Sequence, residues 1–296
     1  MTTVDQDAIH DDVDLPLQEA AFAAAGIDLV QAPWDDASVA WNSFDLVVVR
    51  SPWNYVDRLD AFREWLSARK GLAQFHNPVG LIEWNIDKRS LADLSARGVP
   101  IVPTRFVDAM NDFPLAASSM GSREIVVKPT VSAGSRLTGR FTSDDPAAAA
   151  LAKEILAKGF TVMVQPFASR IDAEGELGTV LFDGVRSHSF HKAALLAENG
   201  ALVGGEYREE ISAVVAPNEV LEIVEAASAA VRAIARERGW LGLEDQLLYG
   251  RYDIIRLDDG TPALLEAELF EPCFFLPTDL DAVGRFVEAV RRRLRD

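Results

Sequence analysis

Hydrophobic and polar positions alternate along the chain with two periods, that of helices and that of strands. Helical periodicity predicts helices over residues 15–25, 58–70, 88–97, 146–158, 218–238 and 281–294. Short β-branched or alternating runs predict strands over residues 27–31, 45–49, 124–128, 161–167, 178–182, 187–192, 249–257 and 263–269. Because helices and strands follow one another throughout, we expect an α/β or α+β protein.

Turn and cap residues mark the limits of several elements. Gly98 follows the helix at 88–97 and two prolines come soon after, so a domain boundary is expected just before this helix. Asp183-Gly184 is a tight-turn signal between two strands and predicts a hairpin. Asn218 is expected to cap the longest helix.

The last two strands carry four charged residues in register. Arg251 and Asp253 are two residues apart on one strand, so their side chains share a face. Glu266 and Glu268 share a face of the next strand, and the Asp-Asp-Gly-Thr turn can bring them beside Asp253. Three carboxylates on a covered face would repel one another unless a cation lay between them, and magnesium suits oxygen ligands completed by phosphates. The ordinary alternative is a solvent-exposed strand face.

The net charge of the chain limits the kinds of molecule that it is expected to bind. The 296 residues carry a formal charge of −17, with a pI of about 4.7, and an acidic surface repels the phosphates of nucleic acids. The acidic start has no apolar core of a signal peptide, and no apolar run approaches the roughly 20 residues of a membrane span. We expect a cytoplasmic protein that binds neither nucleic acid nor membrane, and whether it is a homo-oligomer stays open.

Zinc and thiol chemistry are disfavoured. His188 and His191 are three residues apart on a predicted strand, hence on opposite faces, and Cys273 is the one cysteine. Cys273 stands beside Pro272 and two phenylalanines, which favours a buried apolar residue over a nucleophile. The chain contains neither a P-loop motif nor the protein-kinase motifs, which disfavours those nucleotide-binding folds.

The C-terminal strands resemble a known family. Gly-Arg-Tyr-Asp at 250–253 and Leu-Glu-Ala-Glu at 265–268 are similar to the end of ATP-grasp ligases, the superfamily of D-alanine–D-alanine ligases, glutathione synthetases and ribosomal-protein glutamate ligases. The resemblance implies that the three carboxylates, Asp253, Glu266 and Glu268, bind two magnesium ions, with manganese as a substitute. It implies that Arg251 contacts phosphate and the tetrahedral intermediate. Glu268 stands where asparagine is commoner, which adds a charge.

Further segments resemble the family in the same order between residues 84 and 276. They correspond to two phosphate-binding lysines, a small-residue flap, the hinge that reads adenine, a ribose carboxylate and a lysine facing the γ-phosphate. The ATP-binding residues implied are Lys88, Lys128, Ser132, Gly134, Ser135, Gln165, Phe167, Glu176 and Lys192. Glu206-Tyr207-Arg208 resembles a segment that holds a substrate carboxylate or acyl phosphate, so Arg208 joins Arg251 as a candidate catalytic residue. Taken singly, Lys128 could be an exposed strand end and the loop at 132–139 a flexible turn.

The resemblance also implies an architecture. We expect an ATP-grasp fold that holds the nucleotide between two α+β subdomains, preceded by an α/β domain. The N-terminal, substrate-side domain is expected over residues 1–84, the central or lid subdomain over 85–166, and the C-terminal subdomain with the metal site over 167–296. Family members open with a strand, but here only Thr2–Val4 precede an acidic loop, so that strand is either very short or missing.

Arg-Ser-Pro-Trp-Asn-Tyr at 50–55 follows a predicted buried strand, where ligands commonly bind. Arg50, Trp53 and Tyr55 suit a small zwitterion, with the guanidinium on a carboxylate and the rings beside the rest. The equal alternative is a plug between domains. This stretch resembles a subgroup of the superfamily that includes the O-ureidoserine cyclo-ligases of cycloserine biosynthesis.

The resemblance implies an enzyme that uses ATP and Mg²⁺ to phosphorylate the carboxylate of a small amino-acid-like substrate. A nitrogen nucleophile then captures the acyl phosphate, with release of ADP and phosphate. The subgroup implies that carboxylate and nitrogen belong to one molecule and that the product is an antibiotic ring. Two alternatives stay open: an intermolecular carboxylate–amine ligase, and a non-catalytic ATP-binding regulatory protein.

Overall fold

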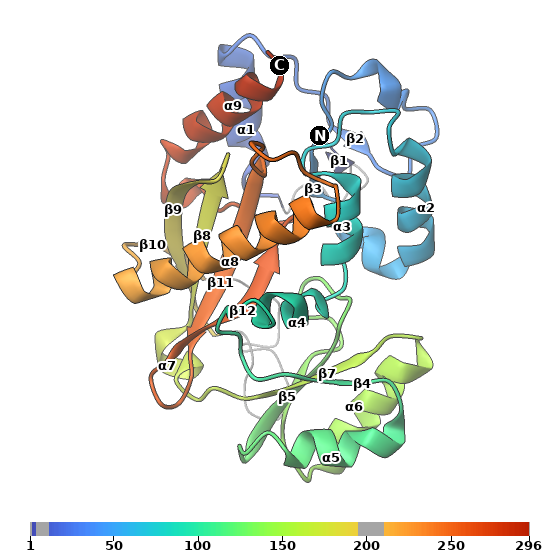
Figure 1. The fold of residues 1–296 in the computed structure, drawn as a ribbon, viewed down its shortest axis with the longest axis vertical. Coiled ribbons are helices and arrows are strands. Elements are labelled where there is room, and N and C mark those ends of the chain that lie inside the picture. The colour runs from blue at the N-terminus through green and yellow to red at the C-terminus, as the bar shows by residue number, and fades with distance from the viewer. Residues whose placement is uncertain (1, 4–11, 195–209, 296) are drawn as a thin grey trace.

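The computed structural model describes residues 2–3, 12–194 and 210–295. Figure 1 shows a small N-terminal unit beside a five-stranded sheet, and a four-stranded sheet with its own helices below them. The mixed α/β and α+β class expected from the sequence is confirmed. The division at residues 84 and 166 stays a prediction. Among the described helices, none has the length and apolar character needed to cross a membrane.

The N-terminal unit contains a parallel three-stranded sheet in the order β2-β1-β3. The strands are β1 (Thr2–Thr3), β2 (Ala32–Pro33) and β3 (Val49–Ser51). The first strand is therefore present and very short. The strand expected at 27–31 is wrong, since pairing begins only at Ala32, and the one expected at 45–49 overlaps β3 only at Val49. In a sheet this short, the residues of β2 and β3 that form strand are those that pair with β1. Because β1 is far from both in sequence, no local pattern reveals which residues these are.

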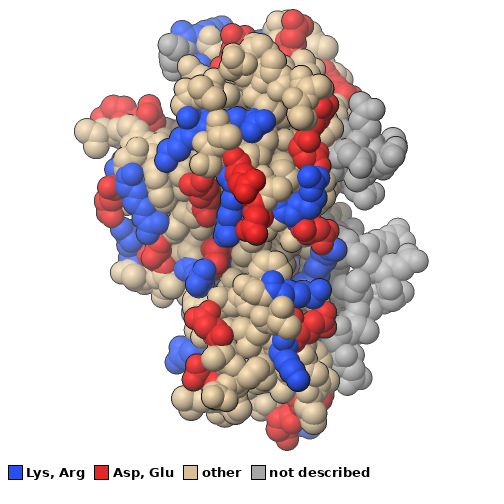
Figure 2. Space-filling model, turned by 90° about the vertical axis from the view of Figure 1, so that its right-hand side faces the viewer, with Lys and Arg blue, Asp and Glu red and all other residues tan. Residues whose placement is uncertain are grey.

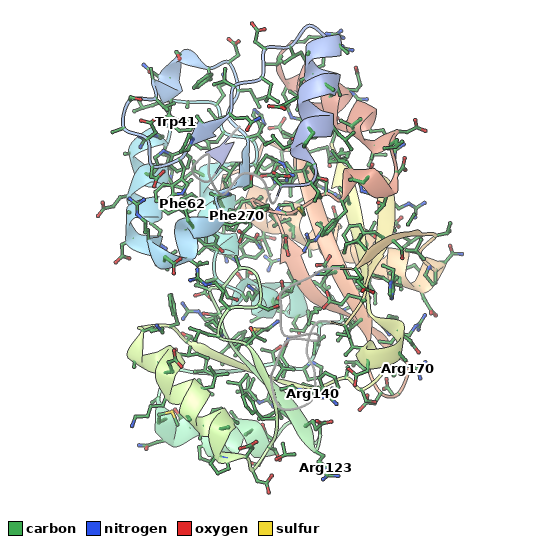
Figure 3. The ribbon with its side chains drawn as sticks, turned by 180° about the vertical axis from the view of Figure 1, so that it is seen from behind. Trp41, Phe62, Arg123, Arg140, Arg170 and Phe270 are labelled. Carbon is green, nitrogen blue, oxygen red and sulfur yellow. The ribbon has the colours of Figure 1, made fainter. Side chains whose placement is uncertain are left out.

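Helices and aromatic rings fill the space around this sheet. Helix α2 (Leu59–Arg69) lies where its periodicity predicted and buries Phe62, Trp65 and Leu66. Phe62 stacks on Trp65 at 5.6 Å between ring centroids and contacts Phe270, which follows the last strand of the five-stranded sheet, at 6.2 Å. Figure 3 shows Phe62 and Phe270 side by side, so aromatic packing joins the N-terminal unit to the C-terminal strands.

The lower sheet is antiparallel, in the order β4-β7-β5-β6. Its strands are β4 (Arg105–Val107), β5 (Glu124–Pro129), β6 (Gly139–Thr142) and β7 (Val162–Pro166). Helices α5 (Phe113–Ser118) and α6 (Pro146–Ala157) cover one face. Asp145 caps α6 by accepting from the amide of Ala147, and Pro146 occupies the first helical position, where its missing N–H costs nothing.

The larger sheet is antiparallel, in the order β10-β9-β8-β11-β12. Its strands are β8 (Glu176–Phe182), β9 (Val185–Lys192), β10 (Ile211–Val214), β11 (Tyr249–Arg256) and β12 (Pro262–Glu268). The hairpin predicted at Asp183-Gly184 is confirmed, with φ of +52° and +73° at the two turn residues, as the tight turn between right-twisted strands requires.

Helix α8 (Asn218–Glu237) packs on one face of this sheet and buries Val220, Val224 and Val231 there. The expectation that Asn218 caps α8 is wrong: Pro217 holds the cap position and Asn218 is already helical. At the other end of the sheet, the C-terminal helix α9 (Ala282–Arg293) packs on α1 (Leu15–Ala24). The chain therefore returns to its N-terminal unit (Figure 1).

Three short helices complete the described fold: α3 (Val79–Asn85), α4 (Ser90–Ser95) and α7 (Ile171–Glu174). The sequence analysis did not predict α3. Four of the six residues before Asn85 are buried apolar or glycine positions, and a helix of seven residues in which Glu83 is the one charged side chain is too short to show a helical period. Helix α4 is shorter than the helix expected at 88–97 but ends before Gly98 as predicted.

Charged side chains are mixed on the surface. Among the described residues on the face seen in Figure 2, lysine and arginine lie among aspartate and glutamate and do not merge into one basic field.

Candidate active site

A cavity of about 940 Å³ lies between the four-stranded and the five-stranded sheets. Its wall includes most of the predicted site residues: Trp53, Tyr55, Lys88, Lys128, Ser132, Gly134, Ser135, Gln165, Phe167, Glu176, Lys192, Arg251, Glu266 and Glu268. Segments far apart in sequence thus meet at one place: Trp53 and Glu271, which are in contact, are 218 residues apart. The volume is that of a small-molecule site.

The two C-terminal strands present their charged residues in the predicted register. Asp253 is paired with Glu266 across the strands, and Arg251 with Glu268. Arg251 Nε and Nη2 donate to the two oxygens of Asp253 at 3.0 and 2.8 Å, and Nη2 also donates to Glu268. Tyr252, between them, points to the opposite face and packs under α8. The alternation along β11 therefore puts polar groups toward the cavity and apolar groups toward the helix.

Three lysines from separate parts of the chain lie near the carboxylates of β11 and β12. Lys128 Nζ, from β5, lies 3.0 Å from Glu266 Oε1. Lys192 Nζ, at the end of β9, lies 3.3 Å from Glu176 Oε2 and 3.9 Å from Asp253 Oδ2.

Lys88 belongs to the same group of cations. Its Nζ donates to the backbone oxygen of Ser132 in the small-residue loop at 3.0 Å. Lysines beside carboxylate oxygens in a cleft form a donor and ligand set for a metal-bound polyphosphate.

Burial and neighbouring charges shift the pKa values of Glu266 and Glu268 in opposite directions. Burial alone would raise the pKa of Glu266, but the charges of Lys88, Lys128 and Lys192 outweigh it and hold this pKa well below its usual range. Burial raises the pKa of Glu268, and the nearby negative charges of Asp253 and Glu266 add to it.

Asp253 is 1% exposed and does not itself line the cavity. Arg251 and Lys192, which do, hold it from the cavity side. The three oxygen donors fit magnesium in type, and Asp253 would share its oxygens between Arg251 and an ion.

Two asparagines position the end of β12. Asn77 Nδ2 donates to the backbone oxygens of Tyr249 and Leu269 at 2.8 and 2.7 Å. Asn85, the last residue of α3, donates to Ala267 O at 2.8 Å and accepts from the Leu269 amide at 2.9 Å. The Asn85 contacts lie on either side of Glu268. The sequence analysis named Lys88 in this stretch of the chain, whereas Asn85 also orients the carboxylate strand.

The end of β7 carries a side-chain amide of fixed orientation. Gln165 is 2% exposed, and its Nε2 donates to Thr104 Oγ1 at 3.0 Å. The Thr104 hydroxyl donates in turn to Val102 O at 2.7 Å, so it can only accept from Gln165. Gln165 Oε1 therefore stays available to accept a hydrogen bond. Next to it, Phe167 lies under the guanidinium of Arg140, at 3.5 Å from the ring centroid.

Gly175 precedes the predicted ribose carboxylate Glu176 and makes a close contact that only glycine allows. Gly175 has φ +61°, and a Cβ there would lie 2.2 Å from the backbone oxygen of Lys192. No larger residue fits between β8 and the end of β9, so Glu176 and Lys192 stay within 3.3 Å of each other.

The structure places only two of the three predicted substrate residues, Arg50, Trp53 and Tyr55, in the cavity wall. Trp53 and Tyr55 line the cavity, but Arg50 does not. Arg50 is 2% exposed, donates to Asp14 and to Pro272 O, and stacks on Phe274 at 3.5 Å from the ring centroid. Its surroundings match the alternative of a plug between domains, so we leave Arg50 out of the proposed substrate contacts.

Glu271 is a cavity residue that the sequence analysis did not identify. Tyr55 Oη donates to Glu271 Oε1 at 2.6 Å, and Trp53 Nε1 donates to the Glu271 backbone oxygen at 3.2 Å. Glu271 also lines the cavity. It follows the strand without belonging to a motif, and the one available signal was a single charge within the apolar run from Leu269 to Phe275.

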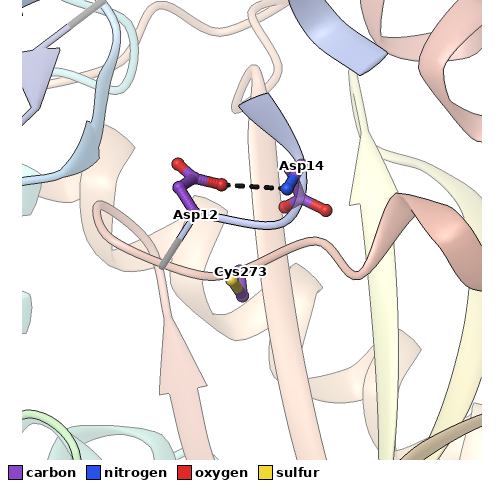
Figure 4. A group of neighbouring side chains, drawn as sticks. All are labelled: Asp12, Asp14 and Cys273. Carbon is purple, nitrogen blue, oxygen red and sulfur yellow. Dashed lines mark hydrogen bonds between the residues drawn. The ribbon is translucent and has the colours of Figure 1, made fainter. Parts of the chain in front are cut away.

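Asp12, Asp14 and Cys273 form a second cluster near this end, with ligand atoms within 4.8 Å of one another (Figure 4). The Asp14 oxygens accept from Arg50 and from the amides of Phe274 and Leu276. Asp12 accepts from the Asp14 amide. Burial raises the pKa of the Cys273 thiol well above its usual value, which disfavours a nucleophilic thiolate. We assign the cluster a structural role: it holds the chain after β12 to the start of α1.

Arg208, the second candidate catalytic residue, lies outside the described residues. Its predicted role stays a prediction.

Comparison with known proteins shows extended similarity. Residues 1–77 match the family described as D-cycloserine synthetase DcsG, N-terminal domain. Cycloserine biosynthesis protein DcsG from Streptomyces lavendulae is 35% identical over 293 residues, which are 96% of this chain and 95% of that protein. The crystal structure of D-cycloserine synthetase DcsG has a TM-score of 0.90 at 32% identity and covers 99% of this chain and 98% of its own. D-alanine–D-alanine ligase from Bacillus anthracis, complexed with ATP, has a TM-score of 0.64 at 14% identity, with 100% and 95% covered, a likeness of fold.

Proposed function

This chain belongs to the D-cycloserine synthetase family of ATP-grasp ligases, and we propose that it closes the ring of O-ureidoserine to give cycloserine. The expected ATP-grasp fold and the class of ATP-dependent carbon–nitrogen ligase are confirmed. One observation above all supports the proposal: three lysines and the carboxylates of β11 and β12 meet in one cavity of nucleotide size.

The proposed nucleotide contacts follow from the geometry. Gln165 Oε1 accepts from the adenine amino group, and Glu176 accepts from the ribose hydroxyls. Lys88, Lys128 and Lys192 neutralise the triphosphate, and the loop at 132–135 brings backbone amides toward it. The fold relative PsnB has been described with Mg and ADP. For this chain we propose magnesium at Asp253, Glu266 and Glu268, as two ions, where it would orient the triphosphate and neutralise its charge.

The chemical step needs no side-chain nucleophile. The substrate carboxylate takes the γ-phosphoryl group, which gives an acyl phosphate and ADP. The oxygen-bound nitrogen of the same molecule then displaces phosphate and closes the five-membered ring. Arg251, held by Asp253 and Glu268, faces the charge that develops on the carbonyl oxygen. The carbamoyl group on that nitrogen leaves with one water as CO₂ and NH₃, so the atoms balance.

Product analysis tests this proposal. Wild-type protein is incubated with Mg-ATP and each enantiomer of O-ureidoserine, and ADP and the organic product are measured by mass spectrometry. We expect ADP and a product of the mass of cycloserine with one enantiomer. A product that joins two molecules from an amino-acid panel would instead identify an intermolecular ligase. Stabilisation by Mg-ATP without ADP release across the panel would identify a binding protein.

A further inference from the structure

Glu271 occupies an unusual position in the cavity wall. Tyr55 Oη binds its Oε1 at 2.6 Å, whereas its Oε2 is inaccessible to solvent and accepts no hydrogen bond from the residues that the structure describes. A buried carboxylate oxygen without a donor costs free energy that folding alone would not retain. Oxygens of this kind are kept where a ligand supplies the donor.

Three cations of the cavity wall are directed to other carboxylates: Lys128 to Glu266, Lys192 to Glu176, and Arg251 to Asp253 and Glu268. Lys88 donates to the backbone oxygen of Ser132. The one hydrogen-bond donor that the described residues give the Glu271 carboxylate is the neutral phenol of Tyr55. Burial raises the pKa of Glu271 to about 8 and the negative charge of Glu268 adds to this rise, although the Tyr55 hydrogen bond and the charge of Lys88 oppose it. A cation from a ligand would remove the conflict by restoring the carboxylate.

The surroundings suit a small organic cation in particular. Trp53, Tyr55 and Phe270 line the same end of the cavity as Glu271. Tyr55 and Phe270 are 5.3 Å apart between ring centroids, at 73° to each other. Aromatic faces beside a carboxylate attract an ammonium group. The last side-chain bond of a glutamate also turns easily, so either oxygen can reach the cavity.

We propose that Glu271 binds the α-ammonium group of the amino-acid substrate, and that Tyr55 is the positioning residue that fixes its carboxylate. The assignment rests on the proposed function, since it places an amino acid with its carboxylate toward Arg251 and the lysines and its ammonium toward Glu271. An ammonium site at Glu271 makes this end of the cavity selective for substrates with a free amino group.

The test compares two ligands that differ only in this group. O-ureidoserine and its analogue with hydrogen in place of the amino group are given to the wild type, Glu271→Gln and Tyr55→Phe, with Mg-ATP. In wild type the missing ammonium should raise KM about 10- to 100-fold, the range for a charged hydrogen bond. Glu271→Gln should raise KM for O-ureidoserine by a similar factor and leave KM for the analogue and for ATP unchanged. Tyr55→Phe should raise KM for O-ureidoserine alone by a smaller factor.

Glu222→Gln provides the matched control, because it makes the same chemical change on an exposed position of α8. An unchanged KM for O-ureidoserine in Glu271→Gln and Tyr55→Phe would overturn the inference. A fall in kcat with KM unchanged would also overturn it, because Glu271 would then act on a proton in the chemical step. Direct titration of O-ureidoserine and the analogue in the presence of Mg-ADP separates the two proposals. Binding that depends on the ammonium and on Glu271, without turnover, would reject the cyclisation and keep the ammonium site; no binding to wild type would reject both.

Discussion

Lys128 Nζ lies 3.0 Å from Glu266 Oε1, and this ion pair joins the four-stranded sheet to the five-stranded sheet across the cavity. Each partner has a second role in the proposed site, Lys128 toward phosphate and Glu266 toward magnesium. We infer that the pair exchanges these partners when Mg-ATP binds. The contact between the two sheets is then coupled to the nucleotide.

Glu266→Gln should abolish turnover while the protein stays folded. The change removes a charged oxygen ligand and leaves Lys128 without its carboxylate, so Mg-ATP should no longer raise the melting temperature as it does for wild type. ADP release and a thermal-shift titration measure the two effects, with Glu222→Gln as the control. Wild-type turnover in Glu266→Gln would mean that the metal assignment is wrong.

Glu268 allows a finer test, because this position has asparagine in many members of the superfamily. Glu268→Asn keeps an oxygen that can bind a metal, whereas Glu268→Ala removes it. We expect the alanine variant to lose roughly 10²–10³-fold in kcat, as for loss of one preorganised polar group, and the asparagine variant to lose much less. Magnesium titrations of both variants measure this. Equal losses would show that the negative charge, which also binds Arg251, matters more than the oxygen.

Base selectivity tests the orientation of Gln165. Thr104 fixes the amide so that Oε1 remains to accept from the adenine amino group, and guanine has an oxo group at that position. Gln165→Leu should therefore lower the preference for ATP over GTP by about fivefold, the value of one hydrogen bond of about 1 kcal/mol. Thr104→Val should lower it less, since the amide is then free to turn. The ratio of kcat/KM for the two nucleotides is the measurement, and an unchanged ratio in Gln165→Leu would contradict the assignment.

The sequence predicted the parts of the site that follow from local spacing. Arg251 and Asp253 share a face because strands have a period of two, whereas the pairing of Asp253 with Glu266 also depends on a bulge between Asp253 and Ile254 that the spacing did not reveal. Sequence order could not show that Lys128 faces Glu266, because that contact depends on how two separate sheets pack. Arg50 shows the same limit: its spacing from Trp53 and Tyr55 was compatible with a binding site and with a plug between domains, and only the three-dimensional structure shows that it lies in the interior beside Asp14.

The same limit explains the elements that were missed. Helix α3 is short and mostly apolar, so it shows no period, and the parallel strands β1 to β3 are also too short to show one. Glu271 lacked any motif, and its importance follows from contacts with Trp53 and Tyr55 more than 200 residues earlier. Non-local contacts decide each of these features.

Arg50 and Asp14 form a buried pair, 2% and 0% exposed, that we expect to stabilise the fold. Arg50→Met leaves a buried carboxylate without its cation and should cost about 3–5 kcal/mol in the free energy of unfolding. Arg97→Met, which removes an exposed pair with Glu237, should cost less than about 1 kcal/mol. Urea denaturation measures both. If Arg50→Met instead raised KM for the amino acid with stability unchanged, Arg50 would be a substrate residue after all.

His76 gives a prediction for the dependence of stability on pH. Burial and the positive charge of Arg293 lower its pKa to about 4, although Asp245 opposes this, whereas in the unfolded chain the pKa is about 6.5. Between these values the unfolded chain binds a proton that the folded chain does not. The contribution of neutral His76 to stability is therefore complete above about pH 6.5 and is lost as the pH drops toward 4.

His188, whose pKa burial also lowers, adds to the same slope. His76→Gln should flatten the slope without removing it, by at most about 1.4 kcal/mol per pH unit, the effect of one proton. Urea unfolding of wild type and variant at several values between pH 4.5 and 6.5 measures the difference. Parallel slopes would mean that His76 binds its proton equally well in both states, in which case burial beneath Arg293 does not control its titration.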